Sequence, residues 1–322
     1  MKKRILKKIS LVFGSILVTL LICVLVYEIV ARIRYHQWRD EFVSTWMGLV
    51  TIPSPNKKLM WEYRPYGVQG TLALNRYGYR DLDYPTRKRP PGVYRVAFAG
   101  DSVTLGMSVL FHETFVWQYG VITRQKHPQL NVQTMNFAVD GYQTFQILEM
   151  IRSRVLAFEP NKVVYAMCLN DFILDGASGY KIEYFNPPKS FFLKKVEEFR
   201  FKRSGVEYHQ YYFNKNHEAV FDAILEMRDI VQRSGAGFFV AVIPVMPFSV
   251  YAGGSFNTYS LKGVHREIDA FFEEHHIAYR DLLSAFVKNQ VPPKHFPNDV
   301  WHPNPAGHRL IAEELSASIP LN

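Results

Sequence analysis

Three residues in this chain have types and spacing that could perform nucleophilic acyl chemistry. Ser102 lies in the tripeptide Gly100-Asp101-Ser102, directly after an apolar stretch typical of a buried strand. Asp299 and His302 lie three residues apart near the C-terminal end. At that spacing the carboxylate can orient the imidazole through one ring nitrogen while the other faces a serine. The sequence thus contains a candidate nucleophile, a candidate base and a candidate orienting acid.

The tripeptide alone also fits a plain turn between a strand and a helix, with Asp101 capping the helix. Thr104 stands where a Gly-x-Ser-x-Gly elbow would have its second glycine, and this disfavours the ordinary α/β-hydrolase fold. The strand before Ser102 favours a parallel sheet, because such sheets carry reactive groups at the carboxyl ends of their strands.

The order and wide separation of four short blocks resemble those of the SGNH hydrolases, also called the GDSL family, in a membrane-anchored bacterial form. The matching blocks are Gly100–Ser102, Asn136–Gly141, Cys168–Asp171 and Asp299–His302, and the similarity covers roughly residues 92–318. The third block departs from the family pattern, since Cys168 stands where a glycine is usual. The resemblance implies that the four blocks, although far apart in the sequence, come together in one active site.

The resemblance implies a role for each site residue. Ser102 would attack an ester carbonyl, His302 would take and return the proton, and Asp299 would hold the imidazole. The oxyanion would be bound by the backbone N–H groups of Ser102 and Gly141 and by the side-chain amide of Asn170. Water would then release the acyl group, so the expected substrate is an acyl ester of a glycan, a lipid or a small alcohol.

Other polar residues near these blocks are expected to play structural parts. Asp101 and Asp171 should bond backbone amides around their turns, and Cys168 should be a small buried side chain. His295 and His308 lie close to the last block, but we expect neither to be the base. No cluster has metal-ligand spacing, so we expect neither a metal nor a cofactor.

Strand and helix patterns alternate after residue 92, which predicts a three-layer α/β/α sandwich with a mainly parallel five-stranded sheet. The expected strands are Arg95–Ala99, Val132–Ala138, Lys162–Met167, Gly237–Ile243 and Ala278–Leu282. The expected helices are Phe115–Lys126, Thr144–Phe158, Glu218–Ser234, Leu261–His275 and Pro305–Ser318. The strand ends would deliver Ser102, Gly141 and Asn170 to one rim.

The charge of the chain lies mostly at its N-terminal end. Of the net charge of +9, the first 40 residues carry +6, from eight Lys/Arg and two acidic residues. The rest is nearly neutral, which disfavours a nucleic-acid partner. A basic segment, 1–8, precedes the uncharged run Ile9–Tyr27, whose 19 residues would rise about 28 Å as a helix and nearly match a bilayer core.

We therefore expect a retained transmembrane anchor at 9–31, with a cleaved signal peptide as the alternative. Five positive charges before the span against three soon after it favour a cytoplasmic N-terminus. The catalytic domain, 92–322, would then be extracytoplasmic, and periplasmic in a Gram-negative cell. A proline-rich lead-in, 32–91, would pack on it, with the element Asn75–Asp81 forming a turn pinned by Arg80 and Asp81.

An insertion at about 176–216 mixes aromatic and basic side chains and could include a short amphipathic helix within residues 191–201. It could form a lid over the site that selects substrates, or it could be ordinary core.

Three functions remain open from the sequence. The first is a membrane-anchored serine esterase, and the second is an O-acyltransferase that passes the acyl group to a sugar hydroxyl of an envelope glycan. The third is a catalytically idle binding or assembly protein that keeps the fold, and the presence of all four blocks disfavours it.

Overall fold

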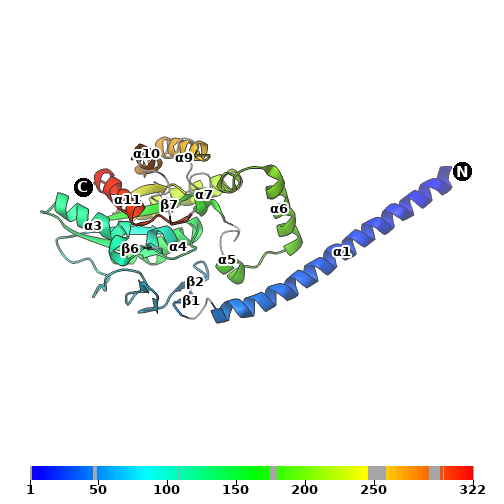
Figure 1. The fold of residues 1–322 in the computed structure, drawn as a ribbon, viewed down its shortest axis with the longest axis horizontal. Helices are drawn as coiled ribbons and strands as arrows, with labels where there is room; N and C mark the ends of the chain where they lie inside the picture. Colours follow the sequence, from blue (N-terminus) through cyan, green and yellow to red (C-terminus); the bar gives the residue numbers. More distant parts are fainter. Residues whose placement is uncertain are drawn as a thin grey trace. The chain divides into compact units, whose positions relative to one another are not determined.

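A computed structural model of the chain describes residues 2–45, 49–107, 109–174, 180–245, 259–289, 298–299 and 301–321. The chain divides into two compact units. One consists of residues 1–48 and 183–206, and the other of residues 49–182 and 207–322. The larger unit contains the sheet, and the smaller one contains a long N-terminal helix (Figure 1).

The larger unit is built on a five-stranded parallel sheet, which confirms the predicted fold class. Its strands are β5 (Val93–Gly100), β6 (Asn131–Ala138), β7 (Lys162–Cys168), β8 (Gly237–Ile243) and β9 (Tyr279–Asp281), in the spatial order β6-β5-β7-β8-β9. Every residue of the central strand β7 is buried, because helices cover both faces. The register sets Gly100 beside both Ala138 and Ala166, so the chain leaves three neighbouring strands at one edge.

The helices divide between the two faces of this sheet. The longer ones are α3 (Phe115–Lys126), α4 (Thr144–Ser153), α7 (Tyr208–Arg233), α9 (Lys262–Glu274) and α11 (Pro305–Ser318), with α2 (Ser102–Leu105) and α10 (Leu283–Lys288) much shorter. Helix α11 packs on α3, whereas α4 packs on α7 and α7 on α9. The connection from β5 to β6 runs one way across the sheet, and the later connections run the other way. Because crossovers between parallel strands are right-handed, the helices of these two sets of connections lie on opposite faces. The result is a three-layer sandwich.

Helix α7 begins ten residues earlier than the sequence predicted. Glu207 accepts hydrogen bonds from the backbone N–H groups of His209 and Gln210, at 2.7 and 3.0 Å, and so caps the helix at its N-terminus. Two aromatic residues of the expected insertion, Tyr212 and Phe213, are consequently buried. This end of the insertion is core rather than lid.

The predicted lead-in, 32–91, is wrong in its first part, because residues 32–45 continue helix α1 of the smaller unit (α1, Lys2–Thr45). Its remaining part, 49–91, packs as short strands and turns within the larger unit. It forms two antiparallel pairs, β1 (Thr51–Pro53) with β2 (Trp61–Tyr63) and β3 (Val68–Gln69) with β4 (Leu72–Ala73). Trp61 and Leu59 are fully or almost fully buried, so this segment belongs to the hydrophobic core.

The smaller unit pairs α1 (Lys2–Thr45) with α6 (Phe191–Ser204), and the end of α5 (Tyr180–Phe185) also contacts α1. Within α1, the stretch Lys8–Glu41 is long and apolar enough to cross a membrane. The Glu28 carboxylate accepts the backbone N–H groups of Phe191 and Phe192 at 3.1 and 3.0 Å, and thereby caps α6. A helix is thus present in the region where the sequence suggested one, and its described partner is α1.

Candidate active site

Ser102 begins α2 directly after β5. The turn between the two elements has room only for a glycine at position 100. A Cβ on Gly100 would lie 2.2 Å from Thr104 Oγ1 and 3.0 Å from the Ala166 carbonyl oxygen. The Asp101 carboxylate accepts the Val103 N–H at 2.9 Å, which caps α2 and fixes the turn. The buried strand thus ends in a rigid corner with Ser102 at its tip.

The structure brings Ser102, His302 and Asp299 into one hydrogen-bonded chain. His302 Nε2 lies 3.0 Å from Ser102 Oγ, and His302 Nδ1 lies 2.8 Å from Asp299 Oδ2. The other carboxylate oxygen, Asp299 Oδ1, accepts the backbone N–H groups of Trp301 and His302, both at 2.7 Å. A base within hydrogen-bond reach of a serine, itself oriented by a carboxylate, can activate the hydroxyl as a nucleophile.

The electrostatics around Asp299 favour its ionised form. Burial raises the pKa of Asp299, but the hydrogen bonds from His302 and from the two backbone N–H groups outweigh burial, so its pKa lies below its ordinary value. A carboxylate that stays charged can stabilise an imidazolium next to it.

Gly141 and Asn170 follow the two strands that flank β5. Gly141 lies in the turn after β6 with a φ of +75°, a left-handed conformation that favours glycine. Asn170 lies in a 3₁₀ turn, Leu169–Phe172, directly after β7. Its Nδ2 donates to Asp101 Oδ2 at 2.7 Å. This bond fixes the amide and uses one of its two hydrogens, which leaves the other for a second acceptor.

The remaining acidic and thiol groups lie beneath the turns and bond to the backbone. Asp171 Oδ2 accepts the Cys168 N–H at 3.1 Å and the Tyr165 hydroxyl at 2.7 Å, while Asp101 caps α2. Burial raises the pKa of both carboxyls, and it raises that of the fully buried Cys168 thiol well above its ordinary value. These groups hold the two turns in shape, and burial keeps Cys168 protonated.

His308 also lies near the site, but its surroundings keep it neutral. Its Nδ1 accepts the Phe115 N–H at 3.1 Å, and its ring stacks on that of Phe115. Burial lowers the pKa of His308 to about 3. His295 lies outside the described residues. In the part of the chain that the structure describes, no group of three or more His, Cys, Asp or Glu side chains could hold a metal ion.

The lead-in motif Asn75–Asp81 supports the turn that carries Ser102 in a way that the sequence did not reveal. The buried Arg80 guanidinium donates to the carbonyl oxygens of Leu105 and Gly106 at the end of α2, and to that of Val109 at 2.8 Å. Asp81 Oδ2 accepts the Asn136 N–H at 2.7 Å. The predicted pinning by Arg80 and Asp81 is thus present, and it acts on the serine block and the second block.

A second lead-in element lies behind the turn that carries Gly141. The Tyr63 hydroxyl donates to the Asp140 carboxylate, and the Tyr142 hydroxyl donates to the Trp61 carbonyl oxygen. The two contacts join residues that are 77 and 81 positions apart in the sequence. No local pattern in the sequence could have identified them.

Comparison with known proteins identifies a family for this chain. The sequence profile of the GDSL-like lipase/acylhydrolase family matches residues 98–310. Among curated proteins, none matches this chain significantly.

Several solved structures are similar in fold. One is a putative GDSL-like lipase from Parabacteroides merdae, with 14% identity and a TM-score of 0.48 over 71% of this chain and 96% of that one. Another is a catalytic mutant of an acetylxylan esterase from Geobacillus stearothermophilus, with 18% identity and a TM-score of 0.46 over 71% and 95%. The profile match spans well over half of the sequence and includes Ser102, Gly141, Asn170, Asp299 and His302. The chain therefore belongs to the GDSL-like lipase/acylhydrolase family, a family of esterase-type hydrolases.

Proposed function

We propose that this protein is a membrane-anchored serine esterase that hydrolyses O-acyl esters outside the cytoplasm. The observation that carries the proposal is the hydrogen-bonded chain from Ser102 Oγ to His302 Nε2 and from His302 Nδ1 to Asp299, at 3.0 and 2.8 Å. Membership of the esterase-type family supports the same reaction class.

The first half of the reaction forms an acyl-enzyme. Ser102 Oγ attacks the ester carbonyl carbon while His302 Nε2 accepts the hydroxyl proton, and the carbonyl oxygen becomes an oxyanion. The backbone N–H groups of Ser102 and Gly141 and the free amide hydrogen of Asn170 donate to this oxyanion, and each donor is worth roughly 2.7–4 kcal/mol of barrier. The C–O bond then breaks, and His302 returns the proton to the leaving alcohol.

The second half releases the acyl group. His302 takes a proton from water, whose oxygen attacks the acyl carbon, and the collapse of the second oxyanion returns the proton to Ser102. If a sugar hydroxyl replaced water in this step, the same residues would perform O-acyl transfer to a glycan, which is the alternative.

The anchor is supported by contacts within the smaller unit. Nearly all side chains of the run from Ile9 to Tyr27 are exposed, as expected for a helix that faces lipid. Farther along α1, Glu28 caps α6 and the Tyr35 hydroxyl donates to the Glu183 and Tyr184 carbonyl oxygens at 3.0 and 2.9 Å. The end of the apolar run also packs on α6, since the ring centroids of Tyr27 and Phe192 lie 6.1 Å apart. A cleaved signal would lose this contact, so a retained helix with a cytoplasmic basic end fits better.

An acyl-release assay tests the proposal. The full chain in detergent micelles is offered esters of graded acyl length and acetylated glycans, with and without a soluble sugar as acceptor, beside Ser102→Ala. We expect acyl release that the substitution lowers by several orders of magnitude. Equal, slow release by wild type and variant from every substrate would overturn the esterase. Acyl transfer to the sugar in preference to water would establish the transferase instead.

A further inference from the structure

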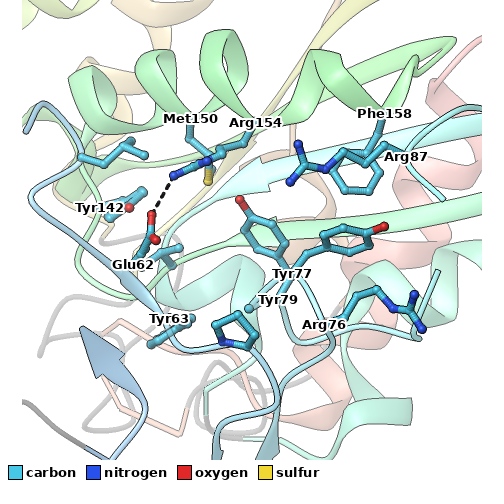
Figure 2. A pocket seen from close by; sticks show the side chains of 14 residues that line it. Glu62, Tyr63, Arg76, Tyr77, Tyr79, Arg87, Tyr142, Met150, Arg154 and Phe158 are labelled. Carbon is cyan, nitrogen blue, oxygen red and sulfur yellow. Dashed lines mark hydrogen bonds and ion pairs between the residues drawn. The ribbon is translucent and has the colours of Figure 1, made fainter. Parts of the chain in front are cut away.

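A cavity of about 180 Å³ lies in the larger unit, between the lead-in and the C-terminal half of α4 (Figure 2). Its lining includes Glu62, Tyr77, Tyr79, Arg87, Arg154 and Phe158, and none of Ser102, Asp299 or His302. We call it the arginine cavity. A single water needs only about 10–15 Å³ measured in this way, so the cavity has room for a ligand the size of a sugar ring.

Arg87 is the most available donor in this cavity. Its guanidinium lies 5.4 Å from the centre of the Tyr77 ring and 5.7 Å from that of Phe158. Among the described residues no acceptor or carboxylate bonds to its N–H groups; only its backbone carbonyl oxygen is engaged, by Arg95. Arg87 is an exposed residue, so its N–H groups face solvent, and the stacking holds the guanidinium where those donors are open to an oxyanion.

Arg154 and Tyr79 also line the cavity. Arg154 Nη2 pairs with Glu62 Oε2 at 2.8 Å, and that oxygen also accepts the Ser54 hydroxyl at 2.9 Å. In Figure 2 the head groups of Arg87 and Arg154 lie above the two tyrosine rings, and a dashed line marks the pair with Glu62.

The Tyr79 hydroxyl has no hydrogen bond within the described ranges, although Arg154, Glu62 and Arg87 all influence its ionisation. Burial raises the pKa of Tyr79, which keeps the hydroxyl a donor at neutral pH.

The cavity therefore has more donors than acceptors. Arg76, a third arginine in the lining, does not add to this excess, because Asp83 holds it through bonds of 3.0–3.1 Å. Arg87 and Tyr79 remain available, and Arg154 retains further N–H groups. An acceptor-rich ligand would match these donors in place of solvent, and a guanidinium pairs best with a carboxylate or phosphate.

We propose that the arginine cavity binds a sugar-sized ligand carrying an oxyanion, either a carboxylate or a phosphate. The oxyanion would pair with Arg87 and the Tyr79 hydroxyl. The ring would lie against the aromatic walls, and its hydroxyl groups would bond to Arg154 and to the free Glu62 oxygen. This binding does not depend on the proposed esterase reaction, because the two sets of residues are different.

Calorimetric titration of the full chain in detergent micelles tests the proposal. The probes are D-glucuronate, glucose 6-phosphate, neutral glucose and inorganic phosphate. Arg87→Met removes the donors but keeps an alkyl chain over the rings, and Lys88→Met removes the same charge from an exposed neighbour outside the lining. Tyr79→Phe removes the hydroxyl alone and keeps the ring on Phe137, whose centroid is 4.7 Å away.

We expect glucuronate or glucose 6-phosphate to bind at least tenfold more tightly than glucose, and the tighter of the two identifies the oxyanion. Arg87→Met should weaken that binding at least tenfold and Tyr79→Phe severalfold, while Lys88→Met should leave it unchanged. Anionic sugars that bind no better than glucose, or unchanged binding by a folded Arg87→Met, would overturn the proposal. Phosphate bound as tightly as glucose 6-phosphate would refute recognition of the ring.

Discussion

His302 lies between the Ser102 hydroxyl and the Asp299 carboxylate, which hold it from opposite sides. Its two ring nitrogens are engaged at 3.0 Å by Ser102 and at 2.8 Å by Asp299, so the tautomer is set by the acid. The Asp299 side chain is 48% exposed, yet it accepts three hydrogen bonds from its own loop. Its position therefore depends on local backbone geometry rather than on deep burial.

This arrangement predicts the effect of Asp299→Asn. The amide oxygen can keep both backbone bonds made by Oδ1, but the amide nitrogen then faces His302 Nδ1 and favours the wrong tautomer, so kcat/KM should fall by roughly four orders of magnitude. The unfolding midpoint should change little, because the side chain is half exposed. Steady-state assays with a small ester and urea unfolding measure both quantities. Full activity in this variant would assign the orienting role to another group.

Asp81 predicts a pH dependence of stability. Burial raises its pKa to about 7 in the folded protein, whereas the unfolded value is about 3.9. The folded state therefore holds the proton more tightly, so the contribution of Asp81 to stability falls as pH rises from about 4 to about 7.

Asp81→Asn tests this sign while preserving an oxygen that can accept the Asn136 N–H. The free energy of unfolding of the wild type, minus that of the variant, should decrease over the same pH range and level off above it. Urea unfolding at several pH values measures the difference. A flat difference would show that folding does not raise the pKa of Asp81.

At the scale of elements, the lead-in supports the α2 corner through Arg80. Replacing Arg80 with Met would leave the carbonyl oxygens of Leu105, Gly106 and Val109 without this donor, and each buried unsatisfied acceptor costs about 1–3 kcal/mol. We expect a loss of roughly 3 kcal/mol or more in the free energy of unfolding, together with weaker catalysis.

Arg76→Met is the matched control for Arg80→Met. It removes an arginine from the same motif, whose exposed pair with Asp83 contributes little. Equal stability of the two variants would mean that Arg80 does not support the corner.

Helix α6 belongs to the unit that contains α1, and the residues of the larger unit form a compact body without it. Replacing 189–203 with a short Gly/Ser linker should therefore leave the sheet folded and hydrolysis of small soluble esters within about threefold of wild type. Hydrolysis rates and near-UV circular dichroism measure these outcomes. Loss of the folded sheet would show that α6 is part of the hydrolase core.

Helices and strands whose own residues carry a clear signal, such as an apolar strand pattern or a helix-capping residue, could be predicted from the sequence. Strand β8 and helix α11 match their predicted bounds, and α11 begins with Asn304 as its N-cap and Pro305 at its first position, which are local start signals. Ser102, Gly141 and Asn170 could be placed at one rim because each directly follows a strand. The earlier start of α7 escaped prediction, because aromatic residues before Glu218 obscured the helical period. The supports of the site, Arg80 and Tyr63, act on residues far along the chain, and only the fold reveals those partners.

The whole molecule combines a long apolar helix with a nearly neutral hydrolase unit. Of the net charge of +9, the first 40 residues carry +6. Most of the net positive charge therefore lies on the helix that we propose as a membrane anchor, and little of it lies on the hydrolase unit. The catalytic proposal rests on the larger unit alone, and its central claim is that Ser102 is an activated nucleophile.

Covalent labelling tests that claim most directly. The full chain in detergent micelles is treated with a fluorophosphonate, which reacts with activated serines, and intact mass and peptide mapping locate the adduct. We predict one adduct per chain on Ser102, none in Ser102→Ala, and strongly slowed labelling in His302→Ala. No adduct on the folded wild type, or equal labelling of Ser102→Ala, would contradict the claim.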